Sequence, residues 1–160
     1  MKIIYEQATK DDINELIRLR MAYLLEDFGE ISELEQSSIR ERLQDYFSRK
    51  LGEELIAFIA MDGEQIVSQA YLHIAEIPAS PVARTGLVGE VFSVYTMPEY
   101  RGQGICSKLI EQLIDCGRQK GLSRIDLFAT DDGYPIYKRA GFSDKITKYT
   151  DMRYVYDSVR

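Results

Sequence analysis

The sequence predicts an α+β domain with a mixed, mostly antiparallel sheet of six or seven strands and about four flanking helices. Strand-like and helix-like hydrophobic periods occupy separate stretches of the chain. The central strands also follow one another through tight turns, which is how antiparallel neighbours are joined. A length of 160 residues suits one domain, so we expect residues 1–160 to fold as a single unit.

The first third of the chain is predicted to be one strand and two helices. A short β-prone run, Lys2–Gln7, comes first. Thr9 offers an N-cap with Asp12 in the capping-box position. Apolar residues then recur every three or four positions, which predicts an amphipathic helix over about Lys10–Phe28. A second helix is expected over about residues 38–50.

The middle of the chain changes to a strand pattern. Leu55–Met61 is an apolar run, and Asp62-Gly63 is a hairpin dipeptide. Ile66–Ile74 is the returning strand, and Gly86–Thr96 follows after a loop rich in proline, serine and alanine. These runs predict an antiparallel meander.

The last third returns to helices and ends in strands. Apolar residues from Ile105 to Cys116 share one helical face, and a glycine ends that helix. Ile125–Thr130 predicts a strand and Pro135–Arg139 a short helix. Residues Phe142–Val155 alternate enough to supply one or two final strands.

Composition excludes several classes of protein. The chain has 26 acidic and 20 basic residues, a net charge of −6, which argues against nucleic-acid binding. It has no apolar run near the roughly 20 residues of a membrane span and no signal peptide at its start, so we expect a cytoplasmic protein. With one histidine, His73, and two cysteines, Cys106 and Cys116, we expect no metal site and no Ser-His-Asp triad.

Charge is unevenly divided along the chain. Residues 1–80 hold 16 acids and 8 bases, whereas residues 81–160 hold 10 acids and 12 bases. Solvated acidic helix faces are the simpler explanation of this division, and a protein that handles one cationic and one anionic ligand is the alternative.

The segment from Val94 to Cys106 carries the clearest chemical signal. A strand ends, a turn with proline follows, and Gly102 and Gly104 open a helix. The first N–H groups of a helix lack partners and lie at its positive end, so a glycine-lined start can bind phosphate. A dinucleotide-binding fingerprint would need glycine where Ser107 stands, and a P-loop would need the sequence Gly-Lys-Ser/Thr at its end. Neither motif is present in this segment.

Two motifs resemble those of the GNAT family of N-acetyltransferases. Arg101-Gly102-Gln103-Gly104-Ile105-Cys106 resembles the acyl-CoA loop, with Cys106 where the family has glycine or alanine. The segment 135–142 resembles the second family signature, and the order of elements matches over essentially the whole chain.

This resemblance implies the fold, the cosubstrate and the residues around it. The sheet would splay between the fourth and fifth strands, where the pantetheine arm of acetyl-CoA pairs with the strand edge. A backbone N–H near Tyr95 would stabilise the oxyanion of the reaction. The implied acetyl-CoA-binding residues are Val94, Tyr95, Thr96, Arg101, Gly102, Gln103, Gly104, Ile105 and Cys106.

The implied activity is direct transfer of the acetyl group to a primary amine within a ternary complex. The acceptor would be a small, cationic molecule or a peptide amine. The alternatives are an acyl-CoA-binding sensor with little turnover and a transferase that acylates hydroxyls. Small domains with exposed sheet edges often pair, so a homodimer is a further expectation.

Two residues are the catalytic candidates. Glu90 lies on the strand that leads to the loop and is the candidate base or cation anchor, with His73 or water as alternatives. Tyr137 is the tyrosine of the second signature and the candidate acid for the departing thiolate. Its place near a helix start predicts a lowered pKa, because the positive end of the helix favours the phenolate.

Overall fold

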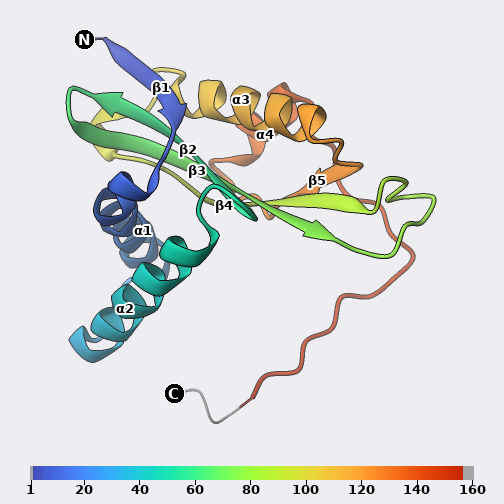
Figure 1. Cartoon of the computed structure of the whole chain (residues 1–160), viewed down its shortest axis with the longest axis horizontal. Helices are drawn as coiled ribbons and strands as arrows, with labels where there is room; N and C mark the ends of the chain where they lie inside the picture. Colours follow the sequence, from blue (N-terminus) through green and yellow to red (C-terminus); the bar gives the residue numbers. More distant parts are fainter. Residues whose placement is uncertain (1, 157–160) are drawn as a thin grey trace.

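The computed structural model describes residues 2–156 and confirms the α+β class (Figure 1). Its sheet has the strand order β1-β2-β3-β4-β5, antiparallel throughout except for the parallel pair β4 and β5. In chain order the elements are β1 (Ile3–Gln7), α1 (Ile13–Phe28), α2 (Glu33–Lys50), β2 (Leu55–Asp62), β3 (Gln65–Glu76), β4 (Leu87–Thr96), α3 (Ile105–Gln119), β5 (Arg124–Asp126) and α4 (Tyr134–Ala140).

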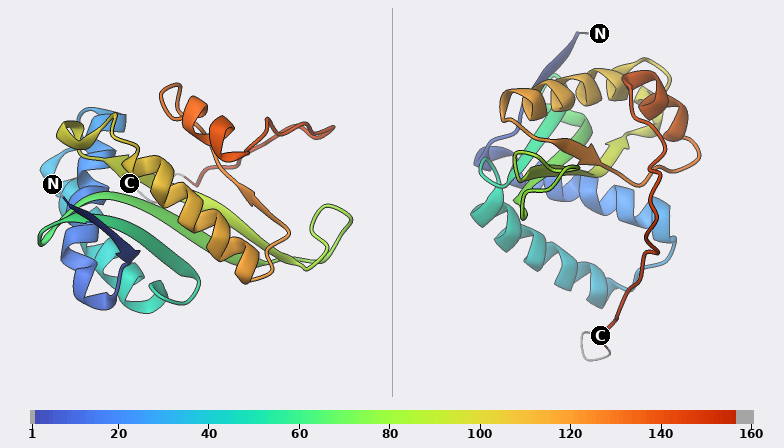
Figure 2. Two further views of the ribbon diagram at one scale, coloured as in Figure 1. Left: turned by 90° about the horizontal axis from the view of Figure 1, so that it is seen from above. Right: turned by 90° about the vertical axis from the view of Figure 1, so that its right-hand side faces the viewer.

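Helices cover both faces of the sheet. Helices α1 and α2 lie on one face, and α3 and α4 lie on the other (Figures 1 and 2). The buried residues 55–60 of β2 contribute to the core on both faces of the sheet, because successive side chains of a strand point to opposite faces. Leu55, Ala57 and Ile59 pack with α1, whereas the residues between them pack with α3. This double burial explains why the strand is apolar without alternation.

The helix starts follow from side-chain caps. Thr9 and Asp12 form the expected capping box ahead of α1, with the Thr9 N–H donating to Asp12 Oδ2 at 2.8 Å. Helix α2 begins at Glu33, five residues before the expected start, because the Ser32 hydroxyl accepts from the Glu35 N–H at 3.2 Å.

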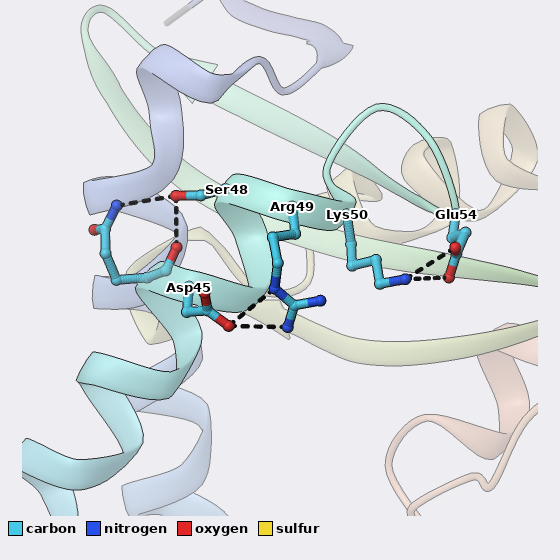
Figure 3. Close-up of polar contacts among 6 residues, drawn as sticks. Asp45, Ser48, Arg49, Lys50 and Glu54 are labelled. Atoms are coloured by element: carbon cyan, nitrogen blue, oxygen red, sulfur yellow. Dashed lines mark hydrogen bonds and ion pairs between the residues drawn. The ribbon is translucent and has the colours of Figure 1, made fainter.

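The end of α2 carries short-range ion pairs (Figure 3). Arg49 pairs with Asp45 one turn earlier at 2.9 Å, and Lys50 pairs with Glu54 across the turn at 2.9 Å. Basic side chains also suit the negative end of a helix.

The number of strands is smaller than expected. The segment 142–155, predicted to form one or two strands, contains none in the part of the chain that the structure describes. The predicted strand Ile125–Thr130 is also shortened to the three residues of β5. A strand is held by ladder hydrogen bonds, and β4 diverges from β5 beyond the pair Glu90 and Asp126. The alternation of apolar and polar residues in 142–155 does not by itself supply a neighbouring strand for these residues to pair with.

Strand β4 carries a bulge at this divergence. Its register with β3 passes from Tyr71 opposite Phe92 to Gln69 opposite Tyr95, so β4 has one residue more than β3 over this stretch. Ser93 takes a φ of 53°, in the left-handed region that costs a non-glycine residue about 1–3 kcal/mol. A bulge bends the strand, which turns the end of β4 away from β5. The expected splay between the fourth and fifth strands is confirmed.

Candidate active site

A cavity of about 520 Å³ lies where β4 and β5 diverge, and we call it the loop cavity. Its lining comes from the end of β4, the loop before α3, the first turn of α3, the end of α1, and α4 with the loop before it. It brings together Tyr137 and eight of the nine residues expected to bind acetyl-CoA: Val94, Tyr95, Thr96, Arg101, Gly102, Gly104, Ile105 and Cys106. Gln103 is not among the lining residues, and its amide donates to the Glu99 carbonyl at 3.3 Å within the turn.

The loop before α3 has the geometry of an anion cradle. Gly102 and Gly104 have φ of 74° and 79°, a region that side chains other than glycine rarely adopt. A Cβ on either glycine would meet no atom within 4 Å, so the backbone at both positions faces open space. Gly104 is the N-cap of a helix of 15 residues, whose first N–H groups are free to donate. The residues present therefore fit a pyrophosphate.

An ion pair crosses the mouth of this cavity. Arg101 donates to Glu26 of α1 at 2.8 Å and to the Thr96 carbonyl at 2.8 Å, and its guanidinium lies 5.4 Å from the Tyr95 ring centre. The hydrogen bond from Arg101 lowers the pKa of the Glu26 carboxyl. This pair connects the loop before α3 to helix α1. Helix α1 also borders a second cavity.

The second cavity, of about 260 Å³, adjoins the first, and we call it the helix-side cavity. Its walls are the C-terminal half of α1, residues 91–94 of β4 and the extended residues after β5. The two cavities share five lining residues: Tyr23, Asp27, Val94, Thr130 and Tyr137. Ligands in the two cavities would therefore meet beside Tyr137 and the β4 bulge.

A buried hydrogen-bond chain holds the bulge. Gln69 donates through Nε2 to the Ser93 hydroxyl at 2.9 Å, and Tyr71 donates to Gln69 Oε1 at 2.9 Å. All three side chains are buried, and burial raises the pKa of Tyr71. A buried polar group without a hydrogen-bond partner lowers the stability of the fold, so this network of hydrogen bonds holds β4 in one conformation at the bulge. Sequence reasoning missed it, since the partners come from two different strands.

Tyr137 is buried at the junction of the two cavities. A Cβ on Gly133 would lie 2.9 Å from the ring, so the ring rests on the bare backbone of that glycine. Burial raises the pKa of Tyr137, with smaller contributions from Cys106 and Tyr23. The expected lowering by the helix end is therefore wrong, because desolvation of the phenolate outweighs any effect of the seven-residue helix α4.

Glu90 and His73 lie elsewhere on the sheet. They are opposite each other in the register of β3 and β4, and the His73 ring contacts Phe92 edge to face at 6.4 Å between ring centres. Within the described chain neither residue lines the loop cavity or the helix-side cavity. The base or anchor role of Glu90 stays a prediction.

Three acidic side chains line the cavities, two from α1 and Asp132 from the loop before α4. Glu26 lines the loop cavity and Asp27 lines both cavities. The uneven charge division in the sequence placed 16 acids in residues 1–80 without singling out either carboxylate of α1. The signal that could have found them is their place in the last turn of an amphipathic helix.

Two structural absences apply to residues 2–156. No cluster of three metal-ligating side chains occurs among them. No helix formed by these residues is long and apolar enough to cross a membrane.

Comparison with known structures supports the fold. The fold matches that of a predicted acetyltransferase with acetyl-CoA from Clostridium acetobutylicum with a TM-score of 0.82 and 28% identity, covering 95% of this chain and 96% of that one. Glucosamine-6-phosphate N-acetyltransferase from Arabidopsis thaliana shares the fold alone, with a TM-score of 0.68 and 15% identity over 95% of this chain and 99% of that one.

Sequence comparison gives a local relative and a family. A stretch of 55 residues is 34% identical to glucosamine 6-phosphate N-acetyltransferase of Trypanosoma brucei brucei, and it spans 34% of this chain and 37% of that protein. The sequence model of the acetyltransferase (GNAT) family matches residues 13–142, which is most of the chain. The chain therefore belongs to the GNAT family of acetyltransferases.

Proposed function

We propose that this GNAT acetyltransferase moves the acetyl group of acetyl-CoA directly to a primary amine of a small cationic molecule or a peptide. The observation that carries the proposal is the junction of two cavities at Tyr137. The loop cavity has an anion cradle at the start of α3, and the helix-side cavity is lined by Asp27, which both cavities share, and by Arg20. A donor in one cavity and an acceptor in the other would meet beside Tyr137.

The loop cavity would hold acetyl-CoA, which supplies an activated acetyl thioester. Backbone N–H groups of residues 101–106 would bind the pyrophosphate, and the free edge of Val94–Thr96 would pair with the pantetheine arm. The β4 bulge would aim a backbone N–H near Tyr95 at the thioester oxygen, where negative charge develops. The buried Gln69–Ser93 hydrogen bond supports this role because it keeps that backbone from relaxing.

Direct transfer is favoured over a covalent acetyl-enzyme. Cys106 is the cysteine in the loop cavity, and burial raises its pKa to about 11. A thiol with that pKa is almost fully protonated at neutral pH and is a weak nucleophile. The acceptor amine is then the group that attacks the thioester.

Tyr137 would donate the proton that the leaving thiolate needs. Its raised pKa keeps the phenol protonated over the whole working pH range. A thiolate that forms in the same buried place is also poorly solvated, which favours its protonation by the phenol.

The acceptor would lose a proton before it attacks, because a free amine with a pKa near 10 is mostly protonated at neutral pH. Asp27 would anchor the ammonium in the helix-side cavity. Glu90, acting through water, is proposed as the base, with His73 as the alternative. Neither residue lines the loop cavity or the helix-side cavity, so this is the step that mutagenesis should address first.

Release of free CoA thiol from acetyl-CoA in the presence of an amine panel tests the proposal. The panel should contain polyamines, aminoglycosides, amino acids, lysine peptides and, as an anionic arm, glucosamine 6-phosphate. We expect turnover with cationic amines that weakens as ionic strength rises. Preference for the anionic amine would contradict the acceptor class. Binding of acetyl-CoA without turnover on any amine would favour the sensor alternative.

A further inference from the structure

The wall that α1 gives to the helix-side cavity carries one cation and one anion. Among the described residues that line this cavity, Arg20 is the basic side chain and Asp27 is the acidic one. Seven residues make about two helical turns, so both side chains lie on one face of α1, about 10.5 Å apart along its axis. Asp27 also lines the loop cavity, whereas Arg20 does not. The anion therefore lies at the junction of the two cavities, and the cation lies away from it.

Neither of these two charges is neutralised by an ion pair within the part of the chain that the structure describes. The neighbouring arginines differ in this respect. Arg18 pairs with Glu15 at 2.8 Å and donates to the Ile66 carbonyl at 2.9 Å. Arg101 pairs with Glu26 at 2.8 Å. Arg20 is half-buried, and its charge is left for a ligand of the cavity.

An aromatic contact holds the Arg20 guanidinium in place. It lies 5.4 Å from the ring centre of Tyr23, and Tyr23 lines both cavities. A cation is attracted to the face of an aromatic ring, but the ring does not neutralise it as a carboxylate does. The guanidinium is thus oriented at the cavity wall while its N–H donors stay available for an anion.

The rest of the helix-side cavity is largely apolar. Phe28 and Phe128 are 69% and 89% exposed, although large aromatic side chains are normally covered. A ligand with an apolar middle would cover this surface. The apolar and aromatic lining residues besides the tyrosines include Leu24, Phe28, Val91, Phe92, Leu127 and Phe128.

We propose that the acceptor carries a carboxylate as well as the amine that is acetylated, as a basic amino acid or a short peptide does, and that Arg20 binds this carboxylate. The inference rests on the proposed acetyl transfer, because it concerns the acceptor of that reaction. The planar fork of a guanidinium matches the two oxygens of a carboxylate. A phosphate dianion would keep a negative charge after pairing with the single guanidinium of this cavity, which is unfavourable near Asp27.

The spacing of the two side chains selects among such acceptors. Arg20 and Asp27 do not pair with each other, so a ligand that binds both must separate its own charges by a chain of several atoms. The side-chain amine of lysine and the N-terminal amine of a dipeptide satisfy this condition. A polyamine has the apolar chain but would bring a second cation to Arg20, where like charges repel.

The first experiment measures acceptor binding without acetyl transfer. Wild-type protein, with and without free CoA, is titrated calorimetrically with matched compounds that differ in the carboxylate. Lysine is compared with lysine amide and with cadaverine, and dialanine is compared with its C-terminal amide. We expect the carboxylate form of at least one set to bind roughly 10- to 100-fold more tightly, the range for hydrogen bonds to a charged group. Equal affinities in every set would overturn the proposal.

Variants assign the preference to Arg20. Arg20→Gln should abolish it, and Arg20→Lys should keep only part of it, because the charge remains but the planar fork is lost. Arg42→Gln is the matched control, since Arg42 is an exposed arginine of α2 that lines neither cavity. It removes the same charge and should leave the preference unchanged. A preference that survives in Arg20→Gln, or one that disappears in Arg42→Gln, would overturn the proposal.

The second experiment separates this inference from acetyl transfer itself. Release of CoA thiol is measured with the same compounds, and we expect kcat/KM to follow the binding preference. Turnover of lysine and cadaverine with equal kcat/KM would overturn recognition of the carboxylate and leave acetyl transfer standing. A binding preference that depends on Arg20, without thiol release from any amine, would support the inference and contradict the proposed function.

Discussion

Replacing Gly133 by alanine should slow acetyl transfer by moving the Tyr137 ring. The added Cβ would lie 2.9 Å from Tyr137 Cε2 and 3.6 Å from Cζ. Restoring an ordinary contact of 3.4 Å requires the ring to move by about 0.5 Å, the difference between 3.4 and 2.9 Å. Gly133 has a φ of −77°, so the substitution causes no backbone strain. The added Cβ would also lie 3.2 Å from Thr130 Oγ1, so the double variant below is needed to separate the effect on the Tyr137 ring.

The size of the effect follows from the displacement. A misplacement of about 1 Å in an active site costs roughly 10²-fold in rate, so about half of that distance should cost roughly 10-fold. A tenfold loss corresponds to about 1.4 kcal/mol of transition-state stabilisation. The affinity for acetyl-CoA should change little, because the cradle glycines lie on a different segment.

The assay is the turnover number at saturating substrates in the wild type, Gly133→Ala, Tyr137→Phe and the double variant. If Gly133→Ala acts through the phenol, its effect should nearly vanish once the hydroxyl is gone. If the losses of turnover in the two single variants add in the double variant, or if Gly133→Ala has wild-type turnover, the proposal that turnover depends on the placement of the Tyr137 hydroxyl is refuted.

Four further outcomes are expected. Tyr137→Phe should lower turnover roughly 10²-fold while thermal shift by acetyl-CoA stays unchanged. The pKa of Tyr137 is raised in the folded protein, so its contribution to stability is complete below pH 10, the pKa of an unfolded tyrosine, and is lost as the pH rises further. The phenol therefore stays protonated, and the pH–rate profile should show no loss of the catalytic acid up to pH 10. Gly104→Val should abolish the thermal shift by acetyl-CoA, about 2.7 kcal/mol at 100 times the dissociation constant, and destabilise the protein by about 1–2 kcal/mol because of its φ of 79°. Glu90→Gln should flatten the acidic limb of the pH–rate profile if Glu90 is the base. A profile that is unchanged in Glu90→Gln but changed in His73→Gln would assign the role of base to His73 instead.

The local signals in the sequence predicted local features well. The capping box of Thr9 and Asp12 and the glycine-opened start of α3 depend on residues a few positions apart, and the structure has both. The order of the helices and central strands followed from hydrophobic periods, which each element satisfies against the two core layers.

Features that depend on distant partners were not predictable. The bulge at Ser93 needs Gln69 and Tyr71 from the neighbouring strand, and nothing near Ser93 in the sequence indicates them. The pKa of Tyr137 was expected to fall because the helix end is visible in sequence, while the burial that raises it is not. Alternation in residues 142–155 indicated strands but could not say which edge they would pair with.

The grouping of residues around the loop cavity was therefore predictable from the sequence, whereas the contribution of α1 to the junction was not. Eight of the nine residues expected around acetyl-CoA line one cavity because they form one continuous strand, loop and helix. Tyr23 and Asp27 reach the junction from α1, about 70 residues earlier in the chain. Only the packing of α1 against β4 brings them there.

A single-turnover reaction with acetyl-CoA labelled in its acetyl group tests the central claim most directly. The enzyme is held in excess over acetyl-CoA, and label is followed in protein and in the amine with and without a cationic acceptor. We predict that label passes to the amine in the presence of acceptor and that none becomes bound to the protein in its absence. Label attached covalently to the protein before the amine is added, above all at Cys106, would contradict direct transfer at the junction of the two cavities.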